Sequence, residues 1–195
     1  MKVLKTPIKS EEVRSLKVGN TIRISGKIFT ARDEAHKKLL FEVHKDNVPE
    51  INFEGLPCFH CGPVMRKNHD WEVVSAGPTT SMRLDKLEPK FMDKFGTKIF
   101  IGKGGMGDET LKALKKNNSI YTQFTGGTGS LMADSVESVD EVYYLEELGI
   151  PEAVWVLNVE EFGPLLVTMD SNGKSLYDKV SNDVKNNLKE IKNSF

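Results

Sequence analysis

Apolar and polar residues alternate most regularly over 21–30, which reads Thr-Ile-Arg-Ile-Ser-Gly-Lys-Ile-Phe-Thr. A period of two is typical of a half-buried strand. Shorter apolar runs predict further strands, and glycine and proline mark turns between the later ones at 149–151 and 162–164. These strands are expected over 71–76, 97–101, 120–124, 139–145, 153–158 and 165–169.

Helical patterns lie between and after these strands, which predicts an α/β fold in one domain over 1–195. A polar loop or short helix is expected over 44–56. Helices are expected over 31–40, 84–95, 108–116 and 174–192. Pro89 predicts that the second helix is interrupted and restarted. The apolar residues of the last helix recur near helical spacing and belong to a core or an interface: Leu176, Val180, Val184, Leu188 and Ile191.

Three of the predicted strands end in glycine-containing turns, at Gly77, Gly102 and Gly126. In an α/β sheet, the loops at strand ends gather along one edge, where ligands bind. The pattern therefore predicts the place of a site, and says nothing of its chemistry.

The first of these turns continues as Gly-Pro-Thr-Thr-Ser-Met-Arg over 77–83. Thr79, Thr80 and Ser81 can cap the free amides of a helix that starts near Thr79, and Arg83 then lies one turn on, on the same face. Hydroxyls, amides and a guanidinium together suit a carboxylate. An ordinary capped helix with a solvent-facing arginine explains the stretch equally well.

The second turn, 102–107, reads Gly-Lys-Gly-Gly-Met-Gly and leads into a helix that Asp108, Glu109 and Thr110 can cap. Such a loop brings backbone amides close to an anion, and Lys103 adds a positive charge. It matches neither the GxxxxGK[ST] loop of nucleotide-binding proteins nor GxGxxG. Some anion is expected here, and phosphate is only weakly indicated.

Arg32 lies where the strand over 21–30 meets the helix over 31–40, a position from which side chains often face a site. His36 shares its helical face. For Arg32 the alternative is a surface ion pair with Asp33 or Glu34, and for His36 a solvated position on the helix.

Composition narrows the class of protein. Of the 195 residues, 28% are charged and the net charge is −1, which argues against a general nucleic-acid or membrane-surface role. No apolar run of about 18 residues exists, and the N-terminus lacks the apolar core of a signal peptide. We expect a cytoplasmic protein.

The two cysteines, Cys58 and Cys61, form a CxxC pair. Such a pair can be redox-active or half of a zinc site, with His60 and His69 as further ligands. No second CxxC completes a four-cysteine site. Two buried thiols in a reducing compartment are the favoured interpretation.

Taken together, seven blocks resemble one family: the β subunit of class I, iron–sulfur-dependent hydro-lyases, also the C-terminal domain of class I fumarate hydratase and the β subunit of L(+)-tartrate dehydratase. The blocks span nearly the whole chain, in order. The sequence departs from the family at 128–130, where it has Thr-Gly-Ser and the family more often has alanines. The double-cysteine form CFHC at 58–61 also varies in the family. The blocks are TARDEAHK at 30–37, CGP at 61–63, GPTTSMR at 77–83, IGKGGM at 101–106, GG at 126–127, EELG at 146–149 and WVL at 155–157.

The resemblance implies a swivelling β/β/α domain with a mixed sheet, and reversible hydration of a small dicarboxylate such as fumarate to (S)-malate, a step of the tricarboxylic acid cycle. It implies a [4Fe–4S] cluster whose cysteines belong to the α subunit, and the two cysteines of this chain are too few for the usual three ligands. This chain is then expected to bind no metal, and to act only with an α subunit, in a heterotetramer with contact between β subunits.

Carried over residue by residue, the resemblance makes Arg32, Arg83 and Lys103 binders of the substrate carboxylates. It makes Thr79 the hydroxyl at the reacting carbon, proposed as the catalytic base. The Gly104 and Gly105 amides are expected to face the substrate, and Asp33 and His36 either orient Arg32 or have no role. L(+)-tartrate is the alternative substrate. A non-catalytic anion-binding module and a thiol or zinc protein are alternatives of other classes.

Overall fold

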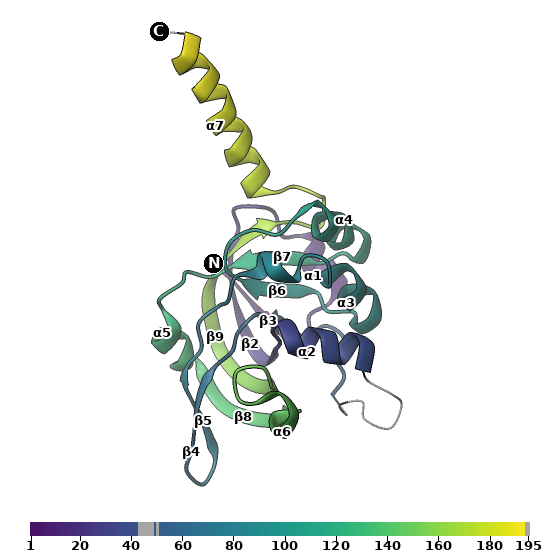
Figure 1. Cartoon of the computed structure of the whole chain (residues 1–195), viewed down its shortest axis with the longest axis vertical. Coiled ribbons are helices and arrows are strands. Elements are labelled where there is room, and N and C mark those ends of the chain that lie inside the picture. The colour runs from purple at the N-terminus through teal and green to yellow at the C-terminus, as the bar shows by residue number, and fades with distance from the viewer. Residues whose placement is uncertain (43–48, 50, 194–195) are drawn as a thin grey trace.

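The computed structural model describes residues 1–42, 49 and 51–193, so most of the loop expected over 44–56 lies outside the described residues. The fold is mixed α/β, as expected (Figure 1). The strands are β1 (Lys2–Lys5), β2 (Thr21–Thr30), β3 (Cys58–Phe59), β4 (Val64–Lys67), β5 (Trp71–Ser75), β6 (Ile99–Gly102), β7 (Ile120–Gln123), β8 (Val136–Tyr143) and β9 (Val154–Met169). The helices are α1 (Ser10–Arg14), α2 (Asp33–Lys37), the π-helix η1 (Lys38–Glu42), the 3₁₀-helix η2 (Ser81–Leu84), α3 (Glu88–Phe95), α4 (Asp108–Asn117), α5 (Gly129–Ala133), α6 (Leu145–Leu148) and α7 (Leu176–Asn193).

The main sheet is mixed and has the order β1-β2-β3-β6-β7-β9-β8. Strands β1, β2, β3, β6 and β7 run parallel to one another. Strand β9 is antiparallel to both β7 and β2. Because β9 pairs with β7 and also with β2, the pairings β2-β3-β6-β7-β9 close into a ring. Hairpin β4–β5 forms a separate two-stranded sheet.

Alternating side chains of the central strands enter two cores. Phe59 and Ile101 point into the core enclosed by the curved sheet, and Phe59 packs against Phe162 with ring centroids 5.2 Å apart. Phe100 and Tyr121 point the other way, into the core beneath α3 and α4. Figure 1 shows α2, α3 and α4 along one side of β3, β6 and β7. Strands buried on both faces explain the short, continuous apolar runs in the sequence.

Strand β9 corrects the sequence-based prediction. The turn expected over 162–164 does not form, because 154–169 is one strand that pairs with β2 on both sides of that point: Ile24 faces Phe162 and Ile22 faces Leu165. The register shifts there, and Gly163 has a φ of +144°. Glycine and proline therefore bend this strand without ending it.

The interruption expected in the helix over 84–95 is confirmed. Helix η2 ends at Leu84, and α3 begins at Glu88 with Pro89 in its first turn. Proline is accepted there because the first amides of a helix have no intrahelical acceptor.

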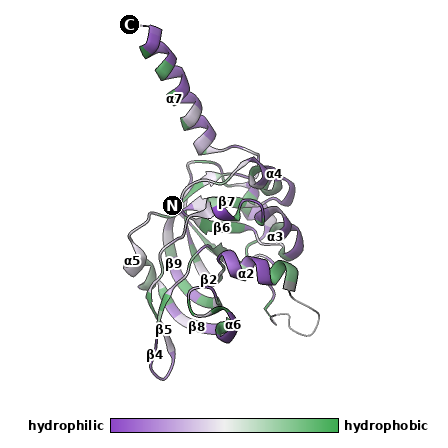
Figure 2. Ribbon diagram, viewed as in Figure 1, coloured by the Kyte–Doolittle hydropathy of each residue, from purple (hydrophilic) through white to green (hydrophobic). Residues whose placement is uncertain are grey.

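Helix α7 also forms as expected, but none of its residues is buried. It projects from the rest of the molecule in Figure 1, with hydrophobic bands along it in Figure 2. Val180, Val184 and Leu188 are 52%, 59% and 49% exposed. The core alternative for these residues is wrong within this chain, and the interface alternative stays a prediction. In the described part of the chain, no helix combines the length and apolar character needed to span a bilayer.

Candidate active site

The three glycine-containing turns meet in space, as expected. The Ala76 amide donates to the Gly129 carbonyl at 2.9 Å, and Thr80 forms a parallel bridge with Lys103. The expected reason, that all three turns follow strands of one sheet, was partly wrong. Gly102 and Gln123 do end parallel neighbours of the main sheet, whereas the first turn leaves the separate β4–β5 hairpin and is tied on by these loop contacts.

Arg83 is held by two partners. Its Nε and Nη2 donate to the two oxygens of Asp33 at 3.1 and 2.9 Å, and Nη2 also donates to Thr79 Oγ1 at 2.9 Å. The expected proximity of Thr79 and Arg83 is therefore confirmed. The expected capping is wrong: the short helix begins at Ser81, and Thr80, its cap residue, makes no side-chain cap. Asp33 lies against Arg83 and not, as one alternative had it, in a pair with Arg32.

The ion pair between Asp33 and Arg83 keeps both side chains charged. Burial alone would raise the pKa of Asp33, but the hydrogen bonds and positive charge of Arg83 hold it below its usual range. Asp33 in turn raises the pKa of Arg83, which stays charged. Because Thr79 Oγ1 accepts a bond from a guanidinium, negative charge on that oxygen would be stabilised.

Arg32 lies just beyond the end of β2, at the N-cap position of α2, where its side chain makes no capping hydrogen bond. Its ion-pair partner is Glu152, at 3.3 Å between Nε and Oε1, and not Asp33 or Glu34. The guanidinium lies against the backbone of Gly62, where a Cβ would come within 2.6 Å of Arg32 Nη1. A side chain at position 62 would therefore displace this cation.

Lys103 differs from the two arginines because its ammonium has no carboxylate partner among the residues described here. It is exposed, and its stem passes 3.0 Å from where a Cβ on Gly126 would lie. The Gly104 and Gly105 amides likewise have no acceptor within the described ranges. One free cation and two free amides in one loop can bind an anion.

Gly102 is required at the base of this loop. A Cβ at this position would lie 1.8 Å from Ser81 Oγ and 2.8 Å from Tyr121 Oη. We expect Gly102→Ala to lower the free energy of unfolding by about 1–3 kcal/mol, the usual range for overpacking. Gly77→Ala is the control, because the nearest atom to its added Cβ is 3.8 Å away. Chemical denaturation of both variants tests this, and equal stabilities would contradict it.

Beneath the site lies a fully buried group of ionisable side chains. Glu88 Oε1 is 2.8 Å from His60 Nε2 and 3.2 Å from His36 Nε2, and all three side chains are 0% exposed. Burial alone would raise the pKa of Glu88, but His36 and His60 hold it at about 2. Burial lowers the pKa of His60. The solvated position considered for His36 is therefore wrong.

Comparison with known proteins adds a family to this geometry. The family model described as "Fumarase C-terminus" matches residues 2–180. The chain belongs to this family. It is 43% identical over 182 residues to a protein named "Putative L(+)-tartrate dehydratase subunit beta" from Methanocaldococcus jannaschii, covering 93% of both chains. It is 43% identical to "L(+)-tartrate dehydratase subunit beta" of Escherichia coli K12, covering 90% of this chain and 86% of the other.

A longer relative shares the same domain. "Putative fumarate hydratase class I" from Geobacillus stearothermophilus is 44% identical over 191 residues, which are 97% of this chain but only 36% of that one. The expected resemblance is therefore confirmed. Members of this Fumarase C-terminus family occur both as separate β subunits and as parts of longer chains.

The residues of this family member do not fit a [4Fe–4S] cluster. Cys58 and Cys61 are both buried and free, and burial raises the pKa of each thiol above its usual range. A cluster of this kind is held by cysteine thiolates, usually three. This chain has two cysteines, and burial favours their neutral thiol form. Within the residues that the structure describes, the possible ligand atoms that lie within 4.8 Å of one another belong to His36, Cys58 and His60, so His69 is not part of such a group.

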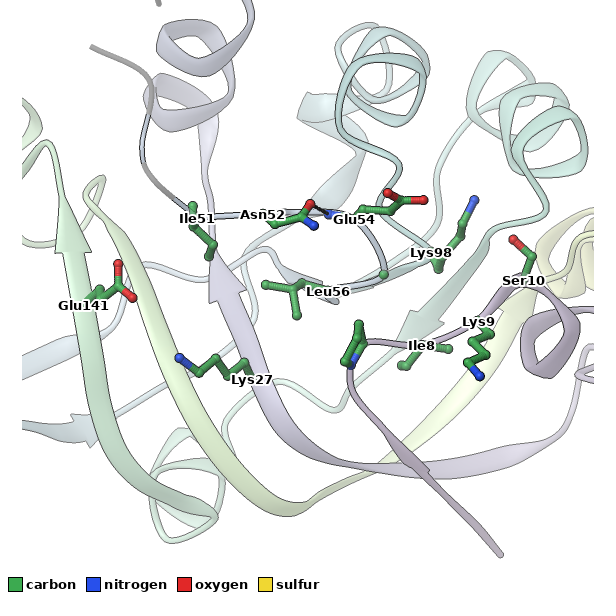
Figure 3. Close-up of a pocket in the computed structure, with 12 residues that line it drawn as sticks. Ile8, Lys9, Ser10, Lys27, Ile51, Asn52, Glu54, Leu56, Lys98 and Glu141 are labelled. Atoms are coloured by element: carbon green, nitrogen blue, oxygen red, sulfur yellow. Dashed lines mark hydrogen bonds between the residues drawn. The ribbon is translucent and has the colours of Figure 1, made fainter. Parts of the chain in front are cut away.

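A pocket of about 660 Å³ opens elsewhere on this Fumarase C-terminus domain (Figure 3). Lys9, Lys27 and Lys98 line it beside Glu54 and Glu141, and none of the expected site residues does. Its mixed charges favour no single ligand, so the candidate site remains the edge where the three turns meet.

The depressed pKa of Glu88 gives a test by pH. A carboxyl with a folded pKa of about 2 against an ordinary 4.5 adds stability above pH 4.5, and this is lost as pH falls towards 2. The difference corresponds to roughly 3 kcal/mol. We expect the free energy of unfolding to fall more steeply over this window in the wild type than in Glu88→Gln. Parallel curves from denaturation at each pH would contradict this.

Proposed function

We propose that this chain is the β subunit of a two-subunit class I hydro-lyase that reversibly hydrates fumarate to (S)-malate. The observation that supports this most is the convergence of Arg32, Thr79, Arg83 and Lys103 at one edge of the sheet. We propose that the [4Fe–4S] cluster is held by the partner α subunit, since the cysteines of this chain do not fit it.

The chemistry explains why these residue types are needed. Dehydration removes a proton from the carbon next to a carboxylate, and negative charge builds on that carboxylate in the transition state. Cations aimed at it stabilise the transition state more than the ground state. Lys103, whose ammonium has no carboxylate partner in the described part of the chain, and the two arginines are cations that meet this need.

Thr79 is proposed to exchange the proton with the reacting carbon. A threonine hydroxyl is a poor base at its ordinary pKa and must be activated. The contact of Arg83 Nη2 with Thr79 Oγ1, at 2.9 Å, favours the alkoxide that would accept the proton. Asp33 holds the guanidinium in place by two hydrogen bonds.

L(+)-tartrate is the second candidate substrate. The observation that favours it is that relatives matching this chain over most of their own length are named tartrate dehydratase β subunits. Tartrate differs from malate by one hydroxyl, which residues of the other subunit can sense. Both substrates are therefore assigned to the same edge of this chain.

The experiment is to co-express this chain with its α subunit, purify the complex without oxygen, and compare kcat/KM for fumarate, (S)-malate and L(+)-tartrate. We expect the highest value for the fumarate–malate pair. A higher value for tartrate would reassign the substrate within the class. A stable complex or chain that binds dicarboxylates and turns over none of them would favour the anion-binding module.

A further inference from the structure

The buried Glu88 has no role in the proposed chemistry, although a buried carboxylate is costly to desolvate. It projects from the first turn of α3, and its Oε1 contacts two histidines. The two histidines come from different elements: His36 from α2 and His60 from the end of β3. Each leads to a different wall of the site.

The first connection runs through His36 to Arg32. His36 Nδ1 lies 2.8 Å from the Arg32 carbonyl oxygen, which also accepts the His36 amide at 2.9 Å. A carbonyl only accepts, so Nδ1 is protonated. Nε2 lies 3.2 Å from Glu88 Oε1. His36 therefore joins the Glu88 carboxylate to the peptide from which the Arg32 side chain projects.

The second connection runs through His60. Its Nε2 lies 2.8 Å from Glu88 Oε1, and its Nδ1 shares a hydrogen bond of 2.9 Å with the Ser81 hydroxyl. Ser81 Oγ in turn accepts the Lys103 amide at 3.3 Å. The His60 carbonyl accepts the Thr79 amide at 2.7 Å. His60 thus reaches Lys103 through its imidazole and Ser81, and it holds Thr79 through its own backbone carbonyl.

Tyr121 extends this network to the glycine loop. Its hydroxyl lies 2.9 Å from Ser81 Oγ and 2.9 Å from the Gly104 carbonyl. Burial raises the pKa of Tyr121, so it remains a hydroxyl. Tyr177, at the start of α7, donates to the same Gly104 carbonyl. The loop that presents the free amides is therefore held from the buried side.

We propose that Glu88 is a positioning residue whose carboxylate, gripped by two imidazoles, sets the spacing between Arg32 on one wall of the site and Thr79 and Lys103 on the other. This inference rests on the proposed function of those three residues. A displacement of about 1 Å in a positioning group can cost roughly a hundredfold in rate. Glu88 thus acts on the substrate only through the backbone of the residues that bind it.

A metal ion held by His36, Cys58 and His60 is the rival interpretation of the cluster. The Nε2 atoms of both histidines already lie against the Glu88 carboxylate, at 3.2 and 2.8 Å from Oε1. Burial also raises the pKa of Cys58, which favours the protonated thiol over the thiolate that a metal needs. Both observations favour a cluster of paired side chains without a metal ion.

The kinetic test compares Glu88→Gln with the wild type in the complex with the α subunit. Glutamine keeps an acceptor for His60 but removes the charge that pairs with His36. We expect KM for the dicarboxylate to rise at least fivefold and kcat/KM to fall at least tenfold. Glu109→Gln is the control, because Glu109 is an exposed acidic residue in the first turn of α4 and should change neither value.

A second test needs no activity. Nitrogen NMR of the full chain with labelled histidines reports the protonation of each ring, and the four histidines are assigned with His36→Gln and His60→Gln. Because both rings contact Glu88, we expect the ring-nitrogen signals of His36 and His60 to move in Glu88→Gln and those of His69 to stay in place. Unchanged His36 and His60 signals in Glu88→Gln would overturn the inference, as would stoichiometric zinc or iron that is lost in His60→Gln.

The two tests separate the inference from the proposed function. A wild-type complex without hydro-lyase activity refutes the function, and the NMR result still decides whether Glu88 acts on both rings. An active wild type with Glu88→Gln within twofold of its kcat/KM refutes the positioning role alone. If Glu88→Gln does not fold, the NMR spectrum and the kinetics of Glu88→Asp decide, with a smaller rise in KM expected from the retained charge.

Discussion

Thr79→Ala will lower kcat of the reconstituted complex by about 10²–10⁴, the range that general acid–base catalysis supplies. The loss should appear in kcat with a smaller change in KM, because the cations that bind the substrate remain. The fold should be retained, since Thr79 is anchored by its backbone amide to the His60 carbonyl and the variant keeps that bond. Steady-state kinetics with fumarate and (S)-malate measure the effect.

Thr79→Ser is the matched control. Serine keeps a hydroxyl within reach of Arg83 Nη2 and should retain most of the activity that alanine loses. Full activity in Thr79→Ala would remove the proton-transfer role from this residue. It would leave the proposal that the edge binds dicarboxylates intact.

Lys103→Ala is expected to have the second-largest effect. Its ammonium has no carboxylate partner among the residues the structure describes, so substrate is the charge it would pair with. Loss of a charged contact in a desolvated site costs about 2 kcal/mol or more, which is roughly a 30-fold fall in kcat/KM. We expect KM to account for a large part of it, because a binding contact to the ground state is also lost.

Lys112→Ala provides the control for charge, because Lys112 is an exposed lysine on neighbouring α4. Its kcat/KM should equal that of the wild type. Thermal unfolding should also be unchanged in Lys103→Ala, since that side chain is exposed. A kcat/KM within twofold of wild type in Lys103→Ala would show that the loop over 102–107 does not bind the substrate.

Local features of this molecule could be predicted from sequence because they depend on short-range spacing. The alternation over 21–30 gave β2 with the bounds observed. The four-residue separation of Thr79 and Arg83 placed their side chains together, although the helix begins later than expected. The glycine-containing turns were found because their composition alone marks them.

The partners of the site residues could not be predicted, because they come from distant parts of the chain. Glu152 pairs with Arg32, but strands β3 to β8 separate the two residues along the chain. The sequence shows Glu88 only as a glutamate with a proline beside it, and the packing of α3 buries it between two histidines. His36 and His60 were visible in the sequence, but their positions did not identify a shared partner.

The single long strand β9 was missed for a related reason. Gly163 and Pro164 are turn residues by local propensity, but pairing with β2 on both sides of them holds the chain extended. Tertiary pairing therefore overrode a local signal. The same ring of pairings brings Ala153 to the buried hydroxyl of Thr30, so β9 and the end of β2 support the position of Arg32 together.

The measurement that tests the account most directly is a titration of this chain into its α subunit under anaerobic conditions, with the hydration of fumarate followed as a rate. The account predicts no activity for this chain alone and a rate that saturates at one chain per α subunit. It also predicts that Thr79→Ala saturates at the same ratio with a far lower rate. Hydration by this chain alone, or full activity of the α subunit without it, would contradict the claim that each subunit supplies half of the site.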